Sequence, residues 1–355
     1  GRESFTSTCA NLSAIGLSNP SAVLFEPGAN RLFIADVYNH RVVVHQLSAS
    51  NGIVDFAADF VLGRPTLTDC ASLAISASTM NYPQGLAFDR SRNRLFVAES
   101  GNNRVLVFDT AALTSGQSAQ NVLGQGTFDA GGSGYGASQL NYPSGLAFDP
   151  INDNLFVSDY NNSRVVVFNT SVIVDGEPAV SVLGQPGFDA GVYGLAIDKM
   201  KYPYDVAYDV AGQRLFVADT NNNRVLMFNL DAGVDAGMAA SNVLGQPWFD
   251  AGAQGVSATE MRFPRGVAFD DSSRLLYVSD TENSRILVFE TTVVANGQAA
   301  LAVLGQAVFD AGVSGTSAST LSYPQRLSLD TDGGRLFVAD SSNSRVMVFD
   351  VATVT

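Results

Sequence analysis

Short hydrophobic runs bounded by Gly, Asp, Asn or Pro follow one another along the whole chain in a repeating order. One copy of this order contains YPQGLAFD (82–89), RLFVAES (94–100), NNRVLVFD (102–109) and NVLGQ (121–125). Each run is rich in residues that favour β-structure and is bounded by residues that favour turns, which predicts a short strand. No sustained helical periodicity separates these runs. The pattern therefore predicts four antiparallel strands in each unit.

The repeat is marked most clearly by the motif Asn-x-Arg followed by Val or Ile. Six repeats at near-constant spacing, each burying its hydrophobic surface against its neighbours, predict an all-β, six-bladed propeller. We expect residues 1–355 to form this single domain, with units that start near residues 1, 63, 124, 184, 245 and 305. The arginines of the motif are Arg41, Arg104, Arg164, Arg224, Arg285 and Arg345.

The sixth unit is expected to lack its outermost strand. In the other units a Val-Leu-Gly strand follows the motif arginine after about 18 to 21 residues, and neither end of this chain supplies one for the sixth. An unpaired strand edge is a template for strand addition by another polypeptide. We expect that edge along Arg345, Val346, Met347, Val348 and Phe349.

Two explanations of the incomplete blade stay open. An extension of the chain can complete its own blade, or a second copy can add a strand. The second contact is heterologous and can propagate into a filament or tube. Residues 1–20, which lack a blade of their own to lie on, are a candidate contact in that case.

Composition and charge narrow the class of partner. The net charge is −14, and a nucleic-acid-binding surface needs cations opposite phosphates, so we expect no nucleic-acid partner. No stretch approaches 18 consecutive apolar residues, which predicts no membrane insertion. The leading hypothesis is a secreted, non-catalytic scaffold or interaction module that binds other proteins, copies of itself included.

The two cysteines bear on the compartment. Cys9 and Cys70 occupy corresponding segments of adjacent units, so a disulfide would fasten the N-terminal segment to the second blade. Two free thiols are the alternative. The chain starts at Gly1 rather than methionine, as a processed product would, although no signal peptide is present. We expect an extracellular or cell-surface location.

The units resemble the NHL-repeat family. The resemblance rests on YPSGLAFD (142–149) and LFVSDYNNSRVVVF (155–168), a pattern that recurs in all six units. It implies the propeller fold and says little about function, because propellers host lyases, lactonases, RNA-binding proteins and plain scaffolds. An extra insert, seen in 124–143, lengthens the unit and is similar to long-repeat bacterial extracellular proteins.

An acidic residue and an asparagine recur in every unit, in the hairpin between the second and third strands. Six carboxylates around a ring could bind cations. A structural role is favoured, because Asp and Asn cap tight turns and the following arginine can pair with a carboxylate between blades. The FDAG segments of four inserts (128–131, 188–191, 249–252 and 309–312) are likewise interpreted as turns that pin the insert to its blade. The repeated polar residues are Asp36, Glu99, Asp159, Asp219, Asp280 and Asp340, with Asn39, Asn102, Asn162, Asn222, Asn283 and Asn343.

Binding residues are expected where the repeat departs from its own pattern. The first strand of a blade lies innermost and opens at one mouth of the central channel. Three charges, Asp205, Arg265 and Arg326, replace small or neutral residues there. A ligand with a carboxylate or hydroxyls could use them, or they could satisfy one another across the channel. The ligand or partner candidates are Tyr204, Asp205, Arg265, Arg326, Gln84 and Gln325.

Catalytic chemistry is disfavoured. The lyases that resemble this fold need a metal held by several histidines, and this chain has only His40 and His45, both in the first unit. No Ser/His/Asp set stands out, and most inner-strand positions are apolar, unlike those of a calcium-dependent lactonase. We predict no catalytic residue, metal ligand or cofactor. A ligand-binding or lactonase- or lyase-like enzyme at the channel mouth stays the alternative.

Overall fold

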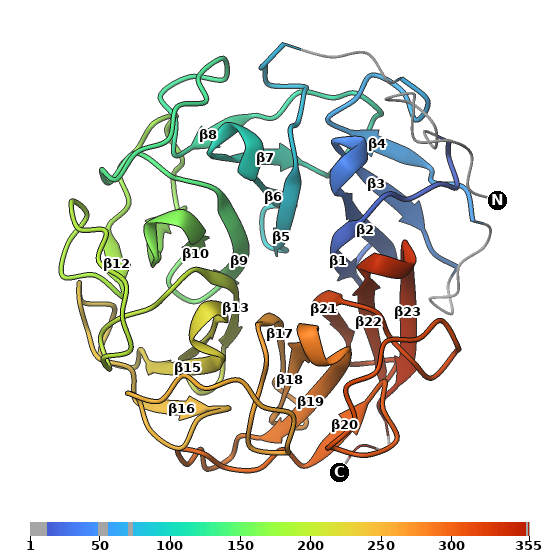
Figure 1. Ribbon diagram of the computed structural model, residues 1–355. Helices are drawn as coiled ribbons and strands as arrows, with labels where there is room; N and C mark the ends of the chain where they lie inside the picture. Colours follow the sequence, from blue (N-terminus) through green and yellow to red (C-terminus); the bar gives the residue numbers. More distant parts are fainter. Residues whose placement is uncertain (1–12, 49–55, 70–73, 353, 355) are drawn as a thin grey trace.

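The computed structural model describes residues 13–48, 56–69, 74–352 and 354, and it consists of six antiparallel sheets set radially around a central axis (Figure 1). We number these blades 1 to 6 in chain order. Strands follow one another outward from the axis in sequence order, which confirms the six-bladed propeller. The innermost strands are β1 (Pro20–Glu26), β5 (Pro83–Asp89), β9 (Pro143–Asp149), β13 (Pro203–Asp209), β17 (Pro264–Asp270) and β21 (Pro324–Asp330).

The second and third strands form a hairpin in every blade. A short 3₁₀ turn joins them, closed by a residue in the left-handed conformation, as at Asn223 (φ 54°). The second strands are β2 (Arg31–Asp36), β6 (Arg94–Glu99), β10 (Asn154–Asp159), β14 (Arg214–Asp219), β18 (Leu275–Asp280) and β22 (Arg335–Asp340). The turns are η1 (Val37–Asn39), η2 (Ser100–Asn102), η3 (Tyr160–Asn162), η4 (Thr220–Asn222), η5 (Thr281–Asn283) and η6 (Ser341–Asn343). The third strands are β3 (Arg41–Gln46), β7 (Arg104–Asp109), β11 (Arg164–Asn169), β15 (Arg224–Asn229), β19 (Arg285–Glu290) and β23 (Arg345–Asp350).

The fourth strand is short and is described in blades 1 to 5 only. Blade 6 has three strands in the described part of the chain, so β23 is its outer edge, as the sequence predicts. The fourth strands are β4 (Phe60–Leu62), β8 (Asn121–Leu123), β12 (Ser181–Leu183), β16 (Asn242–Leu244) and β20 (Ala302–Leu304).

The hydrophobic core lies between neighbouring blades. Because each middle strand is covered on both faces, its apolar residues run continuously instead of alternating with polar ones. At one such boundary Phe96 of blade 2 stacks on Phe148 of blade 3, with ring centroids 5.9 Å apart. Burying one such side chain contributes about 1.5–3 kcal/mol. Equivalent pairs are Phe25–Phe337, Phe33–Phe88, Phe156–Tyr208 and Phe216–Phe269.

Glycines allow the innermost strands to meet around the axis. A Cβ added at Gly85 would lie 2.0 Å from the carbonyl oxygen of Ser144 in the next blade. One added at Gly266 would lie 2.2 Å from the carbonyl oxygen of Gln325. Both contacts are with backbone, which cannot move aside without shifting a whole strand. The Pro-x-Gly start of the strand therefore sets the spacing of the blades.

Gly85→Ala is expected to lower the free energy of unfolding by about 1–3 kcal/mol, because the methyl group overpacks two backbones that already touch. Urea unfolding followed by tryptophan fluorescence measures this loss. Gly126→Ala is the matched control, since a Cβ there meets nothing within 4 Å. Equal unfolding midpoints for the two variants would contradict the role given to Gly85.

Candidate functional site

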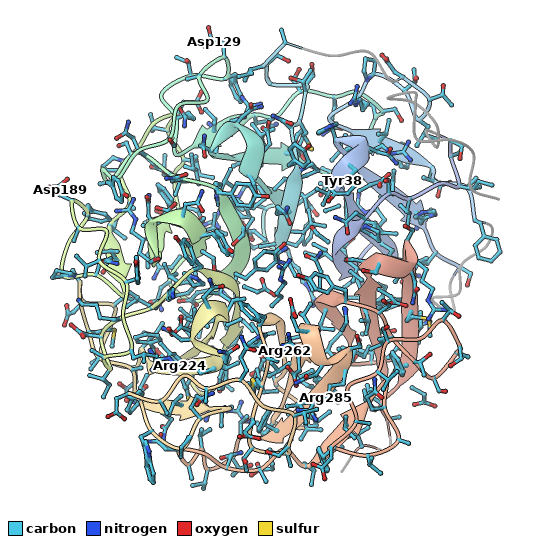
Figure 2. All side chains as sticks on the ribbon, viewed as in Figure 1. Tyr38, Asp129, Asp189, Arg224, Arg262 and Arg285 are labelled. Atoms are coloured by element: carbon cyan, nitrogen blue, oxygen red, sulfur yellow. The ribbon has the colours of Figure 1, made fainter. Side chains whose placement is uncertain are left out.

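The hairpin between the second and third strands of every blade contains an ion pair between its acidic residue and the motif arginine, and this pair is fully buried in blades 1 to 5. In blade 4, Asp219 and Arg224 are partners in the β14–β15 register, and Arg224 Nε lies 2.7 Å from Asp219 Oδ2. Both side chains are fully buried. Arg224 and Arg285 occupy equivalent places in adjacent blades (Figure 2). The other pairs are Arg41–Asp36, Arg104–Glu99, Arg164–Asp159, Arg285–Asp280 and Arg345–Asp340.

Pairing of this arginine with a carboxylate between blades, expected from sequence, is wrong. The strand register places the two charges opposite each other within one hairpin. The guanidinium bridges neighbouring inserts through carbonyls instead: Arg224 donates to Leu195 and Lys199 before the blade and to Phe249 after it. Phe249 begins an FDAG segment, so that segment pins its insert to the arginine of the preceding blade.

The repeated asparagine completes this cluster. Asn222 Nδ2 donates to Asp219 Oδ2 over 2.8 Å, and Asp219 Oδ1 accepts the backbone N–H of Lys201 over 2.7 Å. Burial raises the pKa of Asp219 despite Arg224, and it raises the pKa of Glu99 in blade 2 to about 7. Both oxygens of Asp219 are engaged within the fold. Among the described residues, no group of three or more His, Cys, Asp or Glu side chains is placed to hold a metal ion.

The channel-mouth candidates form a buried polar network. Asp205 of β13 and Arg326 of β21 are each 4% exposed, and Arg326 Nε lies 3.1 Å from Asp205 Oδ1. Asp205 Oδ2 accepts the backbone N–H of Val267 in blade 5 over 3.1 Å. Arg326 also donates to the carbonyls of Gln84 and Tyr204, over 3.0 and 2.8 Å. The ion pair therefore ties blades 2, 4, 5 and 6 together.

Tyr204 links the side-chain amides of Gln84 and Gln325 to this network. Its hydroxyl lies 2.9 Å from Gln84 Oε1 and 2.7 Å from Gln325 Oε1. The guanidinium carbon of Arg326 lies 4.4 Å from the centre of its ring. Burial raises the pKa of Asp205 to about 6, although Arg326 acts in the opposite direction. Five of the six candidates thus satisfy one another across the axis.

Arg265 is separate from the ion pair. Its guanidinium carbon lies 4.9 Å from the ring centre of Tyr204 and 4.8 Å from that of Tyr323. Within the described residues its Nε has no hydrogen-bond partner. Arg265 is partly buried, and no ion pair to it is found among the described residues, so the two aromatic faces hold its charge.

An aromatic rim surrounds these residues, and our sequence analysis did not identify it. In five blades the residue before the first-strand proline is aromatic and has a positive φ of 48–59°. A bulky side chain rarely takes this conformation, which costs conformational energy. The signal was present in the YP and FP dipeptides. These residues are Tyr82, Tyr142, Tyr202, Phe263 and Tyr323.

The assembly-edge candidates lie on β23, and their burial differs from that of other third strands. Val348 is 45% exposed, whereas the residue at its position in the four-stranded blades is 0–6% exposed. A cavity of about 240 Å³ lies beside the strand, between blades 6 and 1. It is lined in part by Val346, Leu17, Ile34 and Val43. The buried equivalents of Val348 are Val44, Val107, Val167, Met227 and Val288.

Two further expectations concern the cysteines and the membrane. Cys9 and Cys70 lie outside the described residues, so their pairing stays a prediction. No helix in the described part of the chain is long and apolar enough to cross a membrane.

Comparison with known proteins agrees with this architecture. The NHL repeat model matches residues 80–108, 140–168, 261–289 and 321–349, in blades 2, 3, 5 and 6. Protein SUPPRESSOR OF QUENCHING 1, chloroplastic, from Arabidopsis thaliana is 26% identical over 94% of this chain and 30% of its own length. NHL repeat-containing protein 2 from Bos taurus is 26% identical over 95% of this chain and 48% of its own length.

The chain thus spans less than half the length of these relatives. Among solved structures, hydrazine synthase from Kuenenia stuttgartiensis aligns with 95% of this chain and 96% of its own, at a TM-score of 0.58 and 14% identity, a likeness of fold alone. The repeat matches, the relatives and the six radial sheets together show a β-propeller with NHL repeats in blades 2, 3, 5 and 6.

Proposed function

We propose that this chain is a non-catalytic, extracellular protein-interaction module that binds a partner polypeptide by adding an extended strand to β23. The observation that carries the proposal is the exposed outer edge of blade 6, where Val348 is 45% exposed. Main-chain hydrogen bonds along such an edge supply affinity, and pockets for alternate side chains supply selectivity. NHL propellers commonly mediate protein interactions, which supports the same role.

The cavity beside β23 suggests the side chain that the added strand presents. In blade 2 the fourth-strand Leu123 pairs with Val105 and packs with Leu140, Val157 and Val166. The equivalent residues at blade 6 are Val346, Leu17, Ile34 and Val43, all of which line the cavity of about 240 Å³. That cavity is therefore where the leucine of a Val-Leu-Gly strand would sit. We propose that the partner strand carries this sequence.

A peptide with the sequence SNVLGQ, that of residues 241–246, tests the proposal. Fluorescence anisotropy of the labelled peptide with the 355-residue chain is expected to show saturable binding. The same peptide with Leu→Asp should bind at least about tenfold more weakly, because a carboxylate would enter an apolar cavity. Absence of binding by SNVLGQ, or equal binding by both peptides, would overturn strand addition.

Sedimentation velocity identifies the source of the strand. If copies of the chain supply it, mass rises with protein concentration and an excess of SNVLGQ reverses the rise. If a separate protein or an extension of the same polypeptide supplies it, the chain stays monomeric and still binds the peptide. Self-assembly is thus the finer form of the proposal and is tested apart from it.

The alternative, a ligand-binding or lactonase- or lyase-like enzyme at the channel mouth, has weaker support. Asp205 and Arg326, the charges such a site would use, are 4% exposed and engaged with each other and with backbone groups. A substrate would have to displace these interactions before binding. This observation supports an interaction role over a catalytic one.

A further inference from the structure

An arginine at the start of the second strand spans the boundary to the next blade in several blades. Arg214 of blade 4 donates through Nε to Asp209 over 2.6 Å and through Nη1 to the carbonyl of Thr291 in blade 5 over 2.8 Å. Its guanidinium carbon lies 5.6 Å from the ring centre of Phe216. An acidic residue, a phenyl face and a carbonyl thus hold the guanidinium. Arg31, Arg94 and Arg335 likewise pair with an acidic residue and lie over a phenyl ring.

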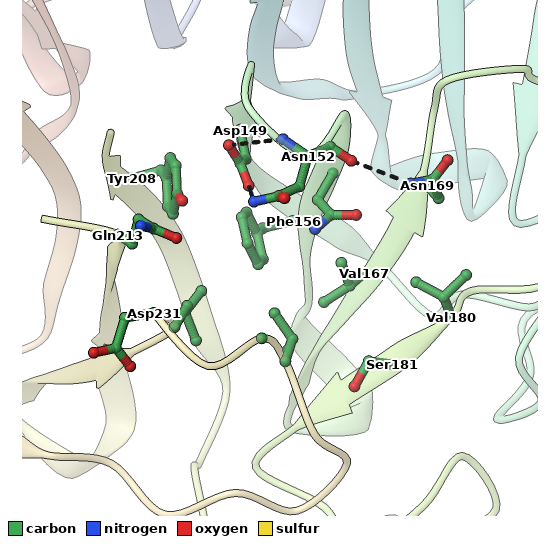
Figure 3. Close-up of a pocket in the computed structure, with 14 residues that line it drawn as sticks. Asp149, Asn152, Phe156, Val167, Asn169, Val180, Ser181, Tyr208, Gln213 and Asp231 are labelled. Atoms are coloured by element: carbon green, nitrogen blue, oxygen red, sulfur yellow. Dashed lines mark hydrogen bonds between the residues drawn. The ribbon is translucent and has the colours of Figure 1, made fainter. Parts of the chain in front are cut away.

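Blade 3 lacks this arginine and has Asn154 instead. The loop that faces it from blade 4 also departs from the repeat, with Leu230 and Asp231 where blades 2, 3 and 5 begin the loop with threonine. The two departures meet at one cavity of about 480 Å³ between blades 3 and 4. Figure 3 shows Asn152 and Asn169 on the blade 3 side and Gln213 and Asp231 on the blade 4 side.

The groups that hold a guanidinium elsewhere are retained around this cavity. Asp149 is 1% exposed, and no ion pair to it is found in the described part of the chain. Its Oδ2, the oxygen equivalent to the one that Arg214 contacts on Asp209, accepts Asn152 Nδ2 over 2.8 Å (Figure 3). Phe156 offers the phenyl face and stacks on Tyr208 of the next blade, with centroids 5.5 Å apart. The acid and the aromatic surface are therefore present without their cation.

Further acceptors line the same space. Ser181 is 6% exposed, and its Oγ has no hydrogen-bond partner among the described residues. Asp231 is exposed at the rim and adds a second carboxylate. A buried hydroxyl without a partner is rare in folded proteins, because leaving it unsatisfied costs about 1–3 kcal/mol. Ser181 lies on β12, three strands from Asp149 on β9, so a donor on another part of the ligand would satisfy it.

Loss of the arginine need not create a site, as blade 5 demonstrates. There Leu275 replaces the arginine, is 4% exposed and joins the apolar cluster that contains Val351. Leucine fills the space with apolar atoms. Asn154 is short and polar, and it leaves a cavity that is lined by Asp149 and Ser181.

We infer that the cavity between blades 3 and 4 binds the guanidinium group of a ligand. A guanidinium is planar and carries five N–H donors, so it can pair with Asp149 and lie over Phe156, as that of Arg214 does with Asp209 and Phe216. The volume of about 480 Å³ lies within the range of ligand pockets, about 300–1,000 Å³. This site is separate from β23 and independent of strand addition.

Isothermal titration with agmatine tests the inference. Agmatine is expected to bind the 355-residue chain. Citrulline, which has an uncharged urea group in place of the guanidinium, should bind at least about tenfold more weakly. L-lysine should also bind more weakly, since its ammonium cannot make the planar contact. Agmatine binding that is absent, or matched by citrulline, would overturn the inference.

Variants of two blades sharpen this test. Asn154→Arg restores the residue of the repeat, so the chain should fill its own cavity, keep its thermal stability and lose agmatine binding. Arg31→Asn opens the equivalent space between blades 1 and 2, where no other ion pair to Glu26 is found in the described part of the chain, and is expected to add a second binding site. Agmatine binding that persists unchanged in Asn154→Arg would place the ligand elsewhere and refute the site.

A blocked peptide, acetyl-Gly-Arg-Gly-amide, distinguishes the two sources of a guanidinium. Binding at least as tight as that of agmatine would assign the site to an arginine side chain of a polypeptide. Binding of agmatine and L-arginine without the peptide would assign it to a free small molecule. In both cases Asp149→Asn should weaken binding by about tenfold or more, because the buried counter-charge is removed.

Discussion

Arg224→Met is expected to lower the free energy of unfolding by about 3–5 kcal/mol, the usual cost of removing one partner from a buried ion pair. The variant leaves Asp219 buried without a cation, and its pKa is already raised by burial. It also removes the donors to the carbonyls of Leu195, Lys199 and Phe249, which belong to two different inserts. Equilibrium unfolding in urea measures the loss, and mobility of both inserts should rise in hydrogen exchange.

Blade 6 provides the control for this substitution. Arg345→Met removes the same type of pair, with Asp340, and donors to the carbonyls of Thr316, Ser317 and Thr320. The side chain of Arg345 is 28% exposed, so water can replace part of what is lost and the expected cost is about 1 kcal/mol. If the two variants lose equal stability, burial is not what makes the arginine of blade 4 important.

The repeat predicted the fold well because the same types of residue form the same strands and turns in every blade. The period of the motif arginine, the two turns and the short Val-Leu-Gly run are local features, and each fixes one strand. The incomplete sixth blade followed from the same count. In contrast, the sequence could not place the partner of Arg224, because that partner depends on the register of β14 against β15.

The channel-mouth residues were found, but only part of their arrangement followed from sequence. Asp205 and Arg326 lie 121 positions apart and come from different blades, so no spacing rule relates them. Each innermost strand also has a register irregularity just after its proline, as between Pro203 and Asp205, which redirects the following side chains. Sequence left open whether the charges pair, and it could not separate Arg265 from the pair.

The cavity between blades 3 and 4 was missed for a related reason. Asn154 and Leu230 are remote in sequence and meet only because blade 4 packs on blade 3. Each is unremarkable alone. Their meaning emerges when the arginine of the other blades is aligned with Asn154 and its carbonyl partner with Leu230. Departures that fall in adjacent units and face the same boundary are thus the signal to seek in such repeats.

Arg326→Met is expected to destabilise the propeller in a pH-dependent manner. Burial raises the pKa of Asp205 from its ordinary value of 3.8 to about 6 even with Arg326 present. A carboxyl whose pKa is raised on folding stabilises the fold at pH values below its pKa in the unfolded chain. This contribution is lost as the pH rises through its pKa in the folded chain. In the unaltered chain the loss is therefore complete a little above pH 6. Without Arg326 the pKa of Asp205 rises further, so the loss continues to higher pH.

Urea unfolding at pH 5 and pH 8 separates this electrostatic effect from loss of hydrogen bonds. At pH 8 the variant should be less stable by about 3–5 kcal/mol, since Asp205 is then ionised in the unfolded chain and lacks its cation in the folded one. At pH 5 the deficit should be clearly smaller and reflect the carbonyls of Gln84 and Tyr204, which lose their donor at any pH. Adding Asp205→Asn should abolish the difference between the two pH values. An equal deficit at both would mean that Arg326 holds the blades together through these carbonyls and not through its charge.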